Sequence, residues 1–460
     1  MTTTTTETQT KAATPTSTIA IAPPPHPGET LSSWLNRVAA ANQMPLYWAL
    51  AATGLTTRHH HTEKPRNYGF SLTDSDLDTL TATTGVTREQ AEAMLMRSWL
   101  GSHAATTDPR GNPISDDARK FALHNWLYVK GSHYCPDCLH ETGGAWLLDW
   151  KRPYVFACTM HKRFLRSHCP KCEQRADYGR LDGTLAPQFP AYVPVPGACH
   201  NPRKQERYRG NRGPCLHDHT HDPSGEEAPE WLLKVQQQLN SDAHDPSWWR
   251  DLRALACYAL NVQTSGDAEN LLGQSLPRQS RHEWDEQYVA RGKRLDATRA
   301  EMRNGLDHRR ASKDTTARTP PTNPHLMAAA AAVAYTCATS DDKLAQLLND
   351  GRRNDTTHSS PTLRLRGYRI SDHLNARATT AWLGDKAAVQ QQGLLSRYTG
   401  PSTTPVNWNP DHLPGYLWND LYDQHLAHHF DGLPLLRDNC RKFAIIALDR
   451  MARGQNWLET

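Results

Sequence analysis

The sequence predicts a mainly α-helical, multidomain protein with an N-terminal helix-turn-helix, central zinc-binding modules with short β-hairpins, and a C-terminal helical region. Three observations support this fold class. The chain has 460 residues, which is enough for two to four domains. Apolar residues recur at helical spacing on both sides of a central segment. That segment, residues 135–215, holds seven of the ten cysteines.

These observations divide the chain into six parts. They are a Thr/Pro-rich tail at residues 1–22, an N-terminal helical domain of the helix-turn-helix type at 23–130, tandem zinc-binding modules at 131–222, a helical domain at 223–312, a linker at 313–325 and a C-terminal helical domain at 326–460. The tail is too poor in apolar residues to bury a core, so we expect it to be disordered.

Composition and charge narrow the class of protein. No run approaches eighteen apolar residues, and the first residues lack the charged and apolar regions of a secretory signal. We therefore expect no membrane span and a reducing, cytoplasmic location, where cysteines at zinc spacing stay free of disulfides. The net charge of +4 is mildly basic and by itself decides nothing about nucleic acid.

A helix, a break and a second helix are expected at the start of the N-terminal domain. Thr30 is a candidate N-cap, and residues 31–38 carry apolar side chains on one helix face. Pro45 breaks the pattern before a second helix at residues 46–53. The three histidines at 59–61 are interpreted as part of a polar loop rather than as metal ligands.

A second helical pair follows in the same domain. A short helix at residues 74–82 leads through a glycine turn to a helix that is capped by Thr87, with Gln90 at its third position. This order of short helix, turn and capped helix is the helix-turn-helix pattern. Docking of DNA or protein by this pair, and plain core packing, remain alternatives.

The cysteine-rich segment predicts two structural zinc sites. A C-x2-C or C-x2-H turn directs two soft ligands to one point, and four such ligands close a tetrahedral site. The first predicted site has the ligands Cys135, Cys138, Cys158 and His161, and the second has Cys169, Cys172, Cys199 and Cys215. Free cysteines or disulfides are the alternative.

Four histidines lie close in sequence to the last two cysteines of the second predicted site. They are His200, His217, His219 and His221. One of them could replace a cysteine as the fourth ligand. We expect them instead to form an exposed, polar exit from the module.

Basic residues surround the predicted ligands. They outnumber acidic residues in the range 151–180, and a second group follows at Arg203, Lys204, Arg207, Arg209 and Arg212. Basic side chains interleaved with an aromatic residue, here Tyr208, suit binding to a phosphate backbone. The second group is therefore the predicted nucleic-acid contact, and a merely solvated surface is the alternative.

The C-terminal half is predicted to be helical. Apolar spacing predicts helices at residues 231–239, 248–260 and 282–310, and a helical pair at 326–348 with Ser340 as a candidate cap. It also predicts linkers at 313–324 and 351–361 and two further helices at 412–426 and 436–457. Cys257, Cys337 and Cys440 lie on apolar faces and are expected to be buried core thiols.

We expect the protein not to be an enzyme. The sequence has no G-x4-G-K-[ST] phosphate loop, no H-E-x-x-H helix and no H-x-E partnered with P-C-x-x-C. Zinc sites filled by four protein ligands leave no position for an activated water. A His-metal nuclease that uses the histidines at 217–221 is the alternative, and it predicts metal-dependent DNA cleavage that His219→Ala abolishes.

The chain resembles the TniQ family of bacterial transposition proteins. The resemblance rests on P-G-E-T-L-S-S-W-L from Pro27, Y-C-P-D-C from Tyr134, F-A-C-T-M-H from Phe156, H-C-P-K-C from His168 and P-G-A-C from Pro196. The resemblance covers about residues 23–215. A weaker similarity to the longer members of the family lies in L-P-G-Y-L-W and R-M-A-R-G-Q-N-W near the C-terminus. The basic insert between Cys199 and Cys215 and the crowded histidines depart from the family pattern.

This resemblance implies an N-terminal helix-turn-helix followed by zinc-binding modules with the eight ligands named above. It also implies a non-catalytic target-selection adaptor that links DNA or a guide-RNA complex to an AAA+ ATPase, which recruits the transposase. A nucleoid-associated location fits that role, and a homodimer stays open. A zinc-containing helix-turn-helix DNA-binding regulator outside transposition shares these features and is the second hypothesis.

Overall fold

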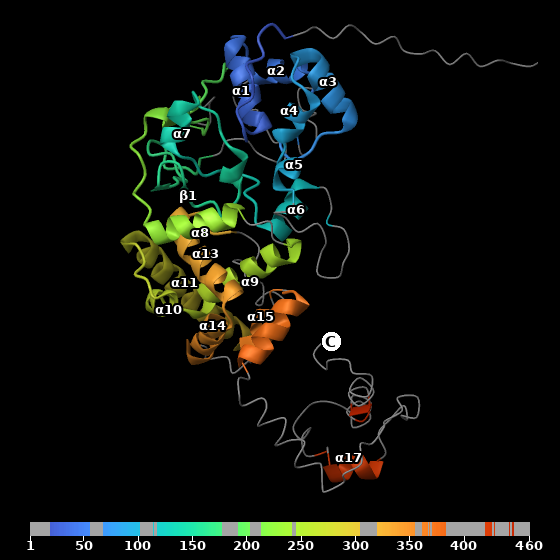
Figure 1. The fold of residues 1–460 in the computed structure, drawn as a ribbon, viewed down its shortest axis with the longest axis vertical. Coiled ribbons are helices and arrows are strands. Elements are labelled where there is room, and N and C mark those ends of the chain that lie inside the picture. The colour runs from blue at the N-terminus through green and yellow to red at the C-terminus, as the bar shows by residue number, and fades with distance from the viewer. Residues whose placement is uncertain are drawn as a thin grey trace, which may run out of the picture. The chain divides into compact units, whose positions relative to one another are not determined.

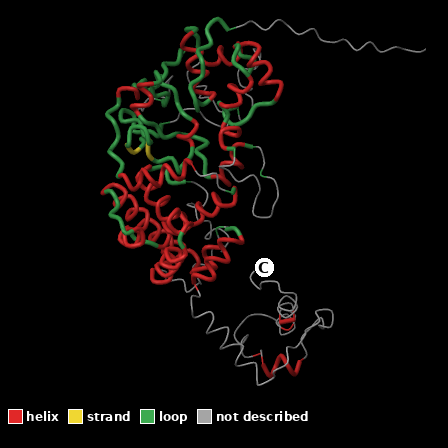
Figure 2. Tube along the Cα trace, in the orientation of Figure 1, coloured by secondary structure: helices red, strands yellow, loops and turns green. Residues whose placement is uncertain are grey.

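The structure is a computed structural model of the chain. It describes residues 19–55, 68–101, 114, 117–176, 192–202, 213–241, 245–303, 320–354, 361–366, 368, 370–382, 419–425, 427, 441 and 444–445. The chain divides into two compact units, Met1–Gly384 and Asp385–Thr460, and each is described by itself. Figure 2 shows that helices dominate the described residues, whereas strands form one short antiparallel pair in the first unit.

Short helices build the N-terminal region of the first unit (Figure 1). They are α1 (Leu31–Ala41), α2 (Leu46–Ala52), α3 (Asp74–Thr84), α4 (Arg88–Ala93), α5 (Met96–Leu100) and α6 (Ala118–Asn125). The hydroxyl of Thr30 accepts a hydrogen bond from the backbone N–H of Ser33 at 3.1 Å, so the predicted N-cap of α1 is confirmed. Trp34 and Leu35 of α1 are fully buried in the core of this region.

The second helical pair begins and ends as its sequence predicts. Thr73 and Thr87 each form a capping box, with Asp76 and Gln90 at the third position of α3 and α4. Gly85 ends α3 with a φ of 75°, a conformation that favours glycine. The two helices are present, and their identity as a DNA-reading helix-turn-helix stays a prediction.

The central segment has little regular structure. Its elements are α7 (Pro136–Glu141), the 3₁₀ turn η1 (Leu148–Lys151), β1 (Ala157–Cys158), β2 (Arg163–Phe164) and the 3₁₀ turn η2 (His219–His221). β1 and β2 pair antiparallel, with Ala157 opposite Phe164 and Cys158 opposite Arg163. The segment is therefore held together by loops and side chains rather than by a sheet.

One segment with the composition of a strand does not form one. Residues 146–150 are rich in aromatic and apolar side chains, as in the expected β-hairpins, but the chain turns through η1 instead. A strand would direct Trp150 and Lys151 to opposite faces, whereas the turn buries both side chains. The amino group of Lys151 donates a hydrogen bond to the carbonyl of Gly131 at 2.8 Å, which satisfies its buried charge with a polar partner.

Longer helices form the remainder of the first unit. They are α8 (Glu230–Ser241), α9 (Pro246–Val262), α10 (Ser265–Leu272), α11 (Arg278–Arg303), α13 (Pro324–Thr339), α14 (Asp341–Asn354) and α15 (Pro361–Arg366). The alanine-rich run Met327–Ala334 of α13 is fully buried in the core of these helices. Because alanine side chains are small, neighbouring helices can approach α13 closely along this run.

The expected linker at 351–361 begins later than predicted, because α14 continues to Asn354. A Cβ added at Gly351 would lie 2.1 Å from the hydroxyl oxygen of Tyr258 on α9. Glycine at this position therefore serves close packing within a helix rather than a chain break.

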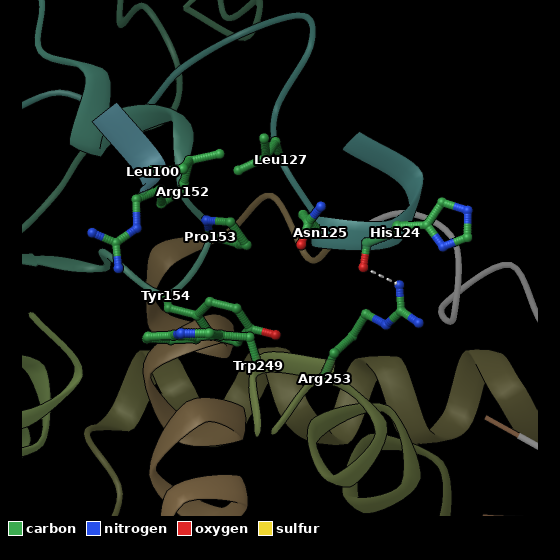
Figure 3. A pocket seen from close by; sticks show the side chains of 9 residues that line it. All are labelled: Leu100, His124, Asn125, Leu127, Arg152, Pro153, Tyr154, Trp249 and Arg253. Carbon is green, nitrogen blue, oxygen red and sulfur yellow. Dashed lines mark hydrogen bonds between the residues drawn. The ribbon is translucent and has the colours of Figure 1, made fainter. Parts of the chain in front are cut away.

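Hydrogen bonds attach the central segment and α6 to the longer helices. The amide oxygen of Gln236 on α8 accepts from the backbone N–H groups of Phe156 and Ala157 at 2.8 and 3.2 Å. Figure 3 shows Arg253 of α9 reaching the last turn of α6, where it donates to the carbonyls of Leu123 and His124 at 2.9 and 2.6 Å. These bonds connect the C-terminal end of α6 to α9.

In the second unit, the structure describes α17 (Asn419–His425) and a few single residues. The buried thiols predicted at Cys257 and Cys337 are confirmed in the first unit, whereas Cys440 and most of the helix expected at 436–457 lie outside the described residues. Across the described part of the chain, no helix combines the length and apolar character needed to cross a membrane.

Candidate metal centres

The first predicted ligand set comes together in the central segment. Cys135 precedes α7, Cys138 lies in its first turn, Cys158 is on β1, and His161 lies in the turn before β2. The Nδ1 atom of His161 lies 3.5, 3.3 and 3.4 Å from the sulfurs of Cys135, Cys138 and Cys158. These four side chains could hold a metal ion.

A carboxylate supports this histidine from outside the group. The Nε2 atom of His161 lies 3.0 Å from a carboxylate oxygen of Glu141, at the end of α7. In metal sites, a histidine ligand commonly donates its second ring N–H to a carboxylate, which fixes the ring orientation. Helix α7 and the residue before it thus supply two of the sulfurs and the carboxylate that orients the nitrogen.

The second predicted ligand set also comes together, and all four of its cysteines are buried. The sulfurs of Cys169 and Cys215 lie 3.9 Å apart, and those of Cys172 and Cys199 lie 3.8 Å apart. The side-chain N–H of Asn201 points at the sulfur of Cys172 from 3.7 Å. Cys215 therefore occupies the fourth position, and this group could likewise hold a metal ion.

The closely spaced thiols of the first group shift one another's pKa. Contact with the Cys135 thiol, followed by contact with Cys158 and by burial, raises the pKa of Cys138. Contacts with Cys135 and Cys138 lower the pKa of Cys158 to about 2. A divalent cation at the centre of the group would stabilise all three thiolates together.

The histidines after Cys215 form a separate group. The Nε2 atom of His217 and the Nδ1 atom of His219 lie 2.5 and 2.9 Å from the two carboxylate oxygens of Asp222. The hydroxyl of Tyr134 donates to the same carboxylate at 2.8 Å. These three residues, His217, His219 and Asp222, could also hold a metal ion by their proximity.

The expectation of an exposed polar exit is therefore wrong for part of this stretch. The side chains of His219 and Asp222 are each 1% exposed, whereas His221 remains 73% exposed. The aromatic rings of Tyr134 and Trp146 cover His219, with ring centroids at 4.6 and 5.9 Å. The polar sequence of this stretch did not indicate the burial of His219. His219 can be buried because Asp222, seven residues after Cys215, supplies its hydrogen-bonding partner.

Two of the basic residues around the ligands are buried, and the predicted nucleic-acid contacts are not described by the structure. Lys151 and Arg152, expected among the exposed basic residues around the ligands, are buried, and Arg152 forms an ion pair with Asp149 at 3.0 Å. The predicted nucleic-acid contacts Arg203, Lys204, Arg207, Arg209 and Arg212 lie outside the described residues, as do the histidines at 59–61.

A comparison with known families bears on the same region. The family model TniQ matches residues 20–165. The match begins near the first described residues, includes the first ligand group and ends directly after β2. No significant match is found among curated proteins or among solved structures. The chain therefore carries a TniQ domain, which confirms its resemblance to the TniQ family and indicates a transposition-associated protein.

Proposed function

We propose that this protein is a non-catalytic target-selection adaptor that binds DNA, or a guide complex on DNA, and recruits an AAA+ ATPase and through it the transposase. The observation that carries the proposal is the TniQ match, which spans the N-terminal helices and the first ligand group. Hydrogen bonds from Gln236 and Arg253 join that domain to the longer helices, as an adaptor that transmits a docking event requires.

Zinc is the metal that this proposal assigns to both four-ligand groups. Tetrahedral zinc with Zn–S bonds of about 2.3 Å separates its sulfur ligands by about 3.8 Å. The sulfur–sulfur distances of 3.6, 3.8 and 3.9 Å fit that requirement. Four protein ligands complete each site, so in the proposal both metals stabilise the fold and neither activates a water.

Charge on the second helical pair supports docking of protein rather than DNA there. The guanidinium of Arg88, at the start of α4, forms ion pairs with Asp74, Asp78 and Glu92. The side chains of Asp74 and Asp78 are 87% and 72% exposed. A phosphate backbone would be repelled by this face, whereas a basic protein surface would be attracted to it.

The predicted DNA contact remains the basic group at residues 203–212. Each phosphate that is neutralised contributes about 0.9 to the slope of log affinity against log salt on duplex DNA. Changing Arg203, Arg207 and Arg209 to Ala together should therefore flatten that slope by about 2 to 3 units. An unaltered slope would remove this group from the interface.

Affinity purification from the native host tests the adaptor role. The tagged full-length protein is purified with and without nuclease treatment, and co-purifying proteins are identified by mass spectrometry. An AAA+ ATPase that persists after nuclease treatment supports the proposal. Partners that all depend on DNA, or no partner, would favour the zinc-containing DNA-binding regulator instead.

A further inference from the structure

A basic groove lies between α6 and the segment that leads into α13. We define it by Arg119 and Leu123 of α6, Tyr128 and Lys130 of the following loop, Arg175, and Thr322. Its volume is about 530 Å³. None of these residues belongs to the candidate metal centres or to the predicted basic group at 203–212.

The charged side chains that line the groove are all positive among the described residues. Its lining contains the cationic side chains of Arg119, Lys130 and Arg175, and no carboxylate is found among the described residues that line it. Arg119 and Lys130 are exposed, and Leu123 beside them is 49% exposed. Cations that converge on a concave surface raise the local concentration of anions more than cations scattered on a convex one.

The floor of the groove is rigid. The guanidinium of Arg175 stacks over the ring of Tyr128, 4.1 Å from its centroid. Gly131 permits this stack, because it has a φ of +72° and a Cβ there would lie 2.6 Å from the Nε atom of Arg175. The N–H of Ser132 bonds the carbonyl of Ala176 at 2.7 Å, which holds the two segments together.

The walls of the groove are also held in place. The hydroxyl of Tyr128 donates to the carbonyl of Pro321, and a ring nitrogen of His133 lies 3.1 Å from the carbonyl of Thr322. On the opposite wall, Arg253 fixes the last turn of α6 (Figure 3). These bonds hold the backbone segments that carry Arg119 and Lys130 in place before any ligand binds.

We propose that this groove binds the phosphate backbone of duplex DNA without reading its sequence. Arg119 and Lys130 contact phosphate oxygens, and Leu123 packs against the sugar edge between them. Arg175, which is half-buried, supplies a third positive charge beneath the contact. This inference rests on the proposed function, because a target-selection adaptor must remain on DNA while its other surfaces engage protein.

The experiment measures how salt affects binding of the full-length, zinc-loaded protein to a fluorescein-labelled 30-base-pair duplex of random sequence. Fluorescence anisotropy is recorded over a series of salt concentrations. The variant Arg119→Ala/Lys130→Ala should reduce the slope of log affinity against log salt by about 1.8, because two phosphate contacts are lost. Both side chains are exposed, so an unchanged melting temperature is expected to confirm that the variant is folded.

The matched control is Lys234→Ala/Arg281→Ala, which removes the same two charge types from exposed ion pairs with Glu230 and Glu269, outside the lining of the groove. Its slope should equal that of the wild type. A further variant, Arg119→Lys with native Lys130, keeps both positive charges and should have the slope of the wild type. An unaltered slope in the groove variant, or an equal loss in the control, would overturn the inference.

Two further readouts separate this inference from the proposed function. Tighter binding to an RNA duplex of the same length would overturn the assignment to DNA. The groove variant should still co-purify the AAA+ ATPase from nuclease-treated lysate. If the wild-type protein recruits no ATPase, but its salt slope still differs from that of the groove variant, the adaptor role is contradicted and the groove assignment stands.

Discussion

The two four-ligand groups and the group of His217, His219 and Asp222 lie close together in sequence, yet their atoms are spaced differently. Within the four-ligand groups, potential ligand atoms that are in direct contact lie 3.3 to 3.9 Å apart, and all lie within 4.8 Å of one another. In the third group, the two histidines lie 2.5 and 2.9 Å from Asp222. The first spacing leaves room for a central ion, whereas the second is that of direct hydrogen bonds.

This difference separates two ways of stabilising a segment that has almost no sheet or helix. The cysteine groups contain thiols that would become thiolates on a cation, and such binding energy is folding energy. In the third group, ionised Asp222 accepts hydrogen bonds from His219, His217 and Tyr134, which together hold its pKa at about 2 despite its burial. A carboxylate that already has three donors gains little from a metal ion.

The largest effect is expected from Cys135→Ser. Loss of one sulfur ligand should release one equivalent of zinc and unfold the central segment, since structural zinc supplies on the order of 10 kcal/mol of folding free energy. Zinc content and circular dichroism measure both effects. The matched control is Cys337→Ser, which alters a buried thiol outside the groups and should keep the full zinc content. A folded Cys135→Ser variant with undiminished zinc would contradict the metal assignment.

Asp222→Asn tests the third group. The amide cannot accept from three donors, so the variant should lose about 3 kcal/mol of unfolding free energy while its zinc content stays the same. Denaturant unfolding and metal analysis on the same sample give both quantities. His219→Gln should likewise keep the zinc content, whereas Cys215→Ser should lose one equivalent. Loss of zinc in the Asp222 or His219 variant would make the third group a metal site and revive the nuclease hypothesis.

His325 lies outside the three groups, so its effect on the pH dependence of stability reports protonation rather than metal release. Burial lowers the pKa of His325, which stacks on Phe164, from 6.5 to about 4. The folded state therefore binds fewer protons than the unfolded state, and stability falls as pH decreases from 6.5 towards 4. The loss is at most about 3 kcal/mol. Urea unfolding at fixed excess zinc should show a smaller pH slope for His325→Gln than for the wild type.

The smallest expected effect is that of Glu141→Gln. This carboxylate orients His161, and its side chain is 54% exposed. Removing its charge should weaken zinc binding at the first group by about tenfold, the lower end of the usual effect for such supporting residues. Competition with a zinc-binding dye measures this change. An equal weakening at the second group would point to a general loss of stability instead.

Local signals predicted much of the fold. The caps at Thr30 and Thr87 and the glycine stop at Gly85 depend on contacts between near neighbours in the chain. The thiols at Cys257 and Cys337 are buried as their apolar surroundings predicted. The division into six parts, the DNA-reading role of the second helical pair and the zinc ligation itself remain predictions.

The sequence by itself determined three pairs of candidate ligands, because the two-residue spacing of Cys and His lets both members of a pair meet at one point. The pairs are Cys135 with Cys138, Cys158 with His161, and Cys169 with Cys172. Only the tertiary structure decided that Cys215, rather than a histidine, completes the second group, and that His219 is buried against Asp222. It also decided that Lys151 points inward and that Arg119, Lys130 and Arg175 share one groove. These outcomes depend on contacts between segments far apart in the chain, which periodicity and spacing do not encode.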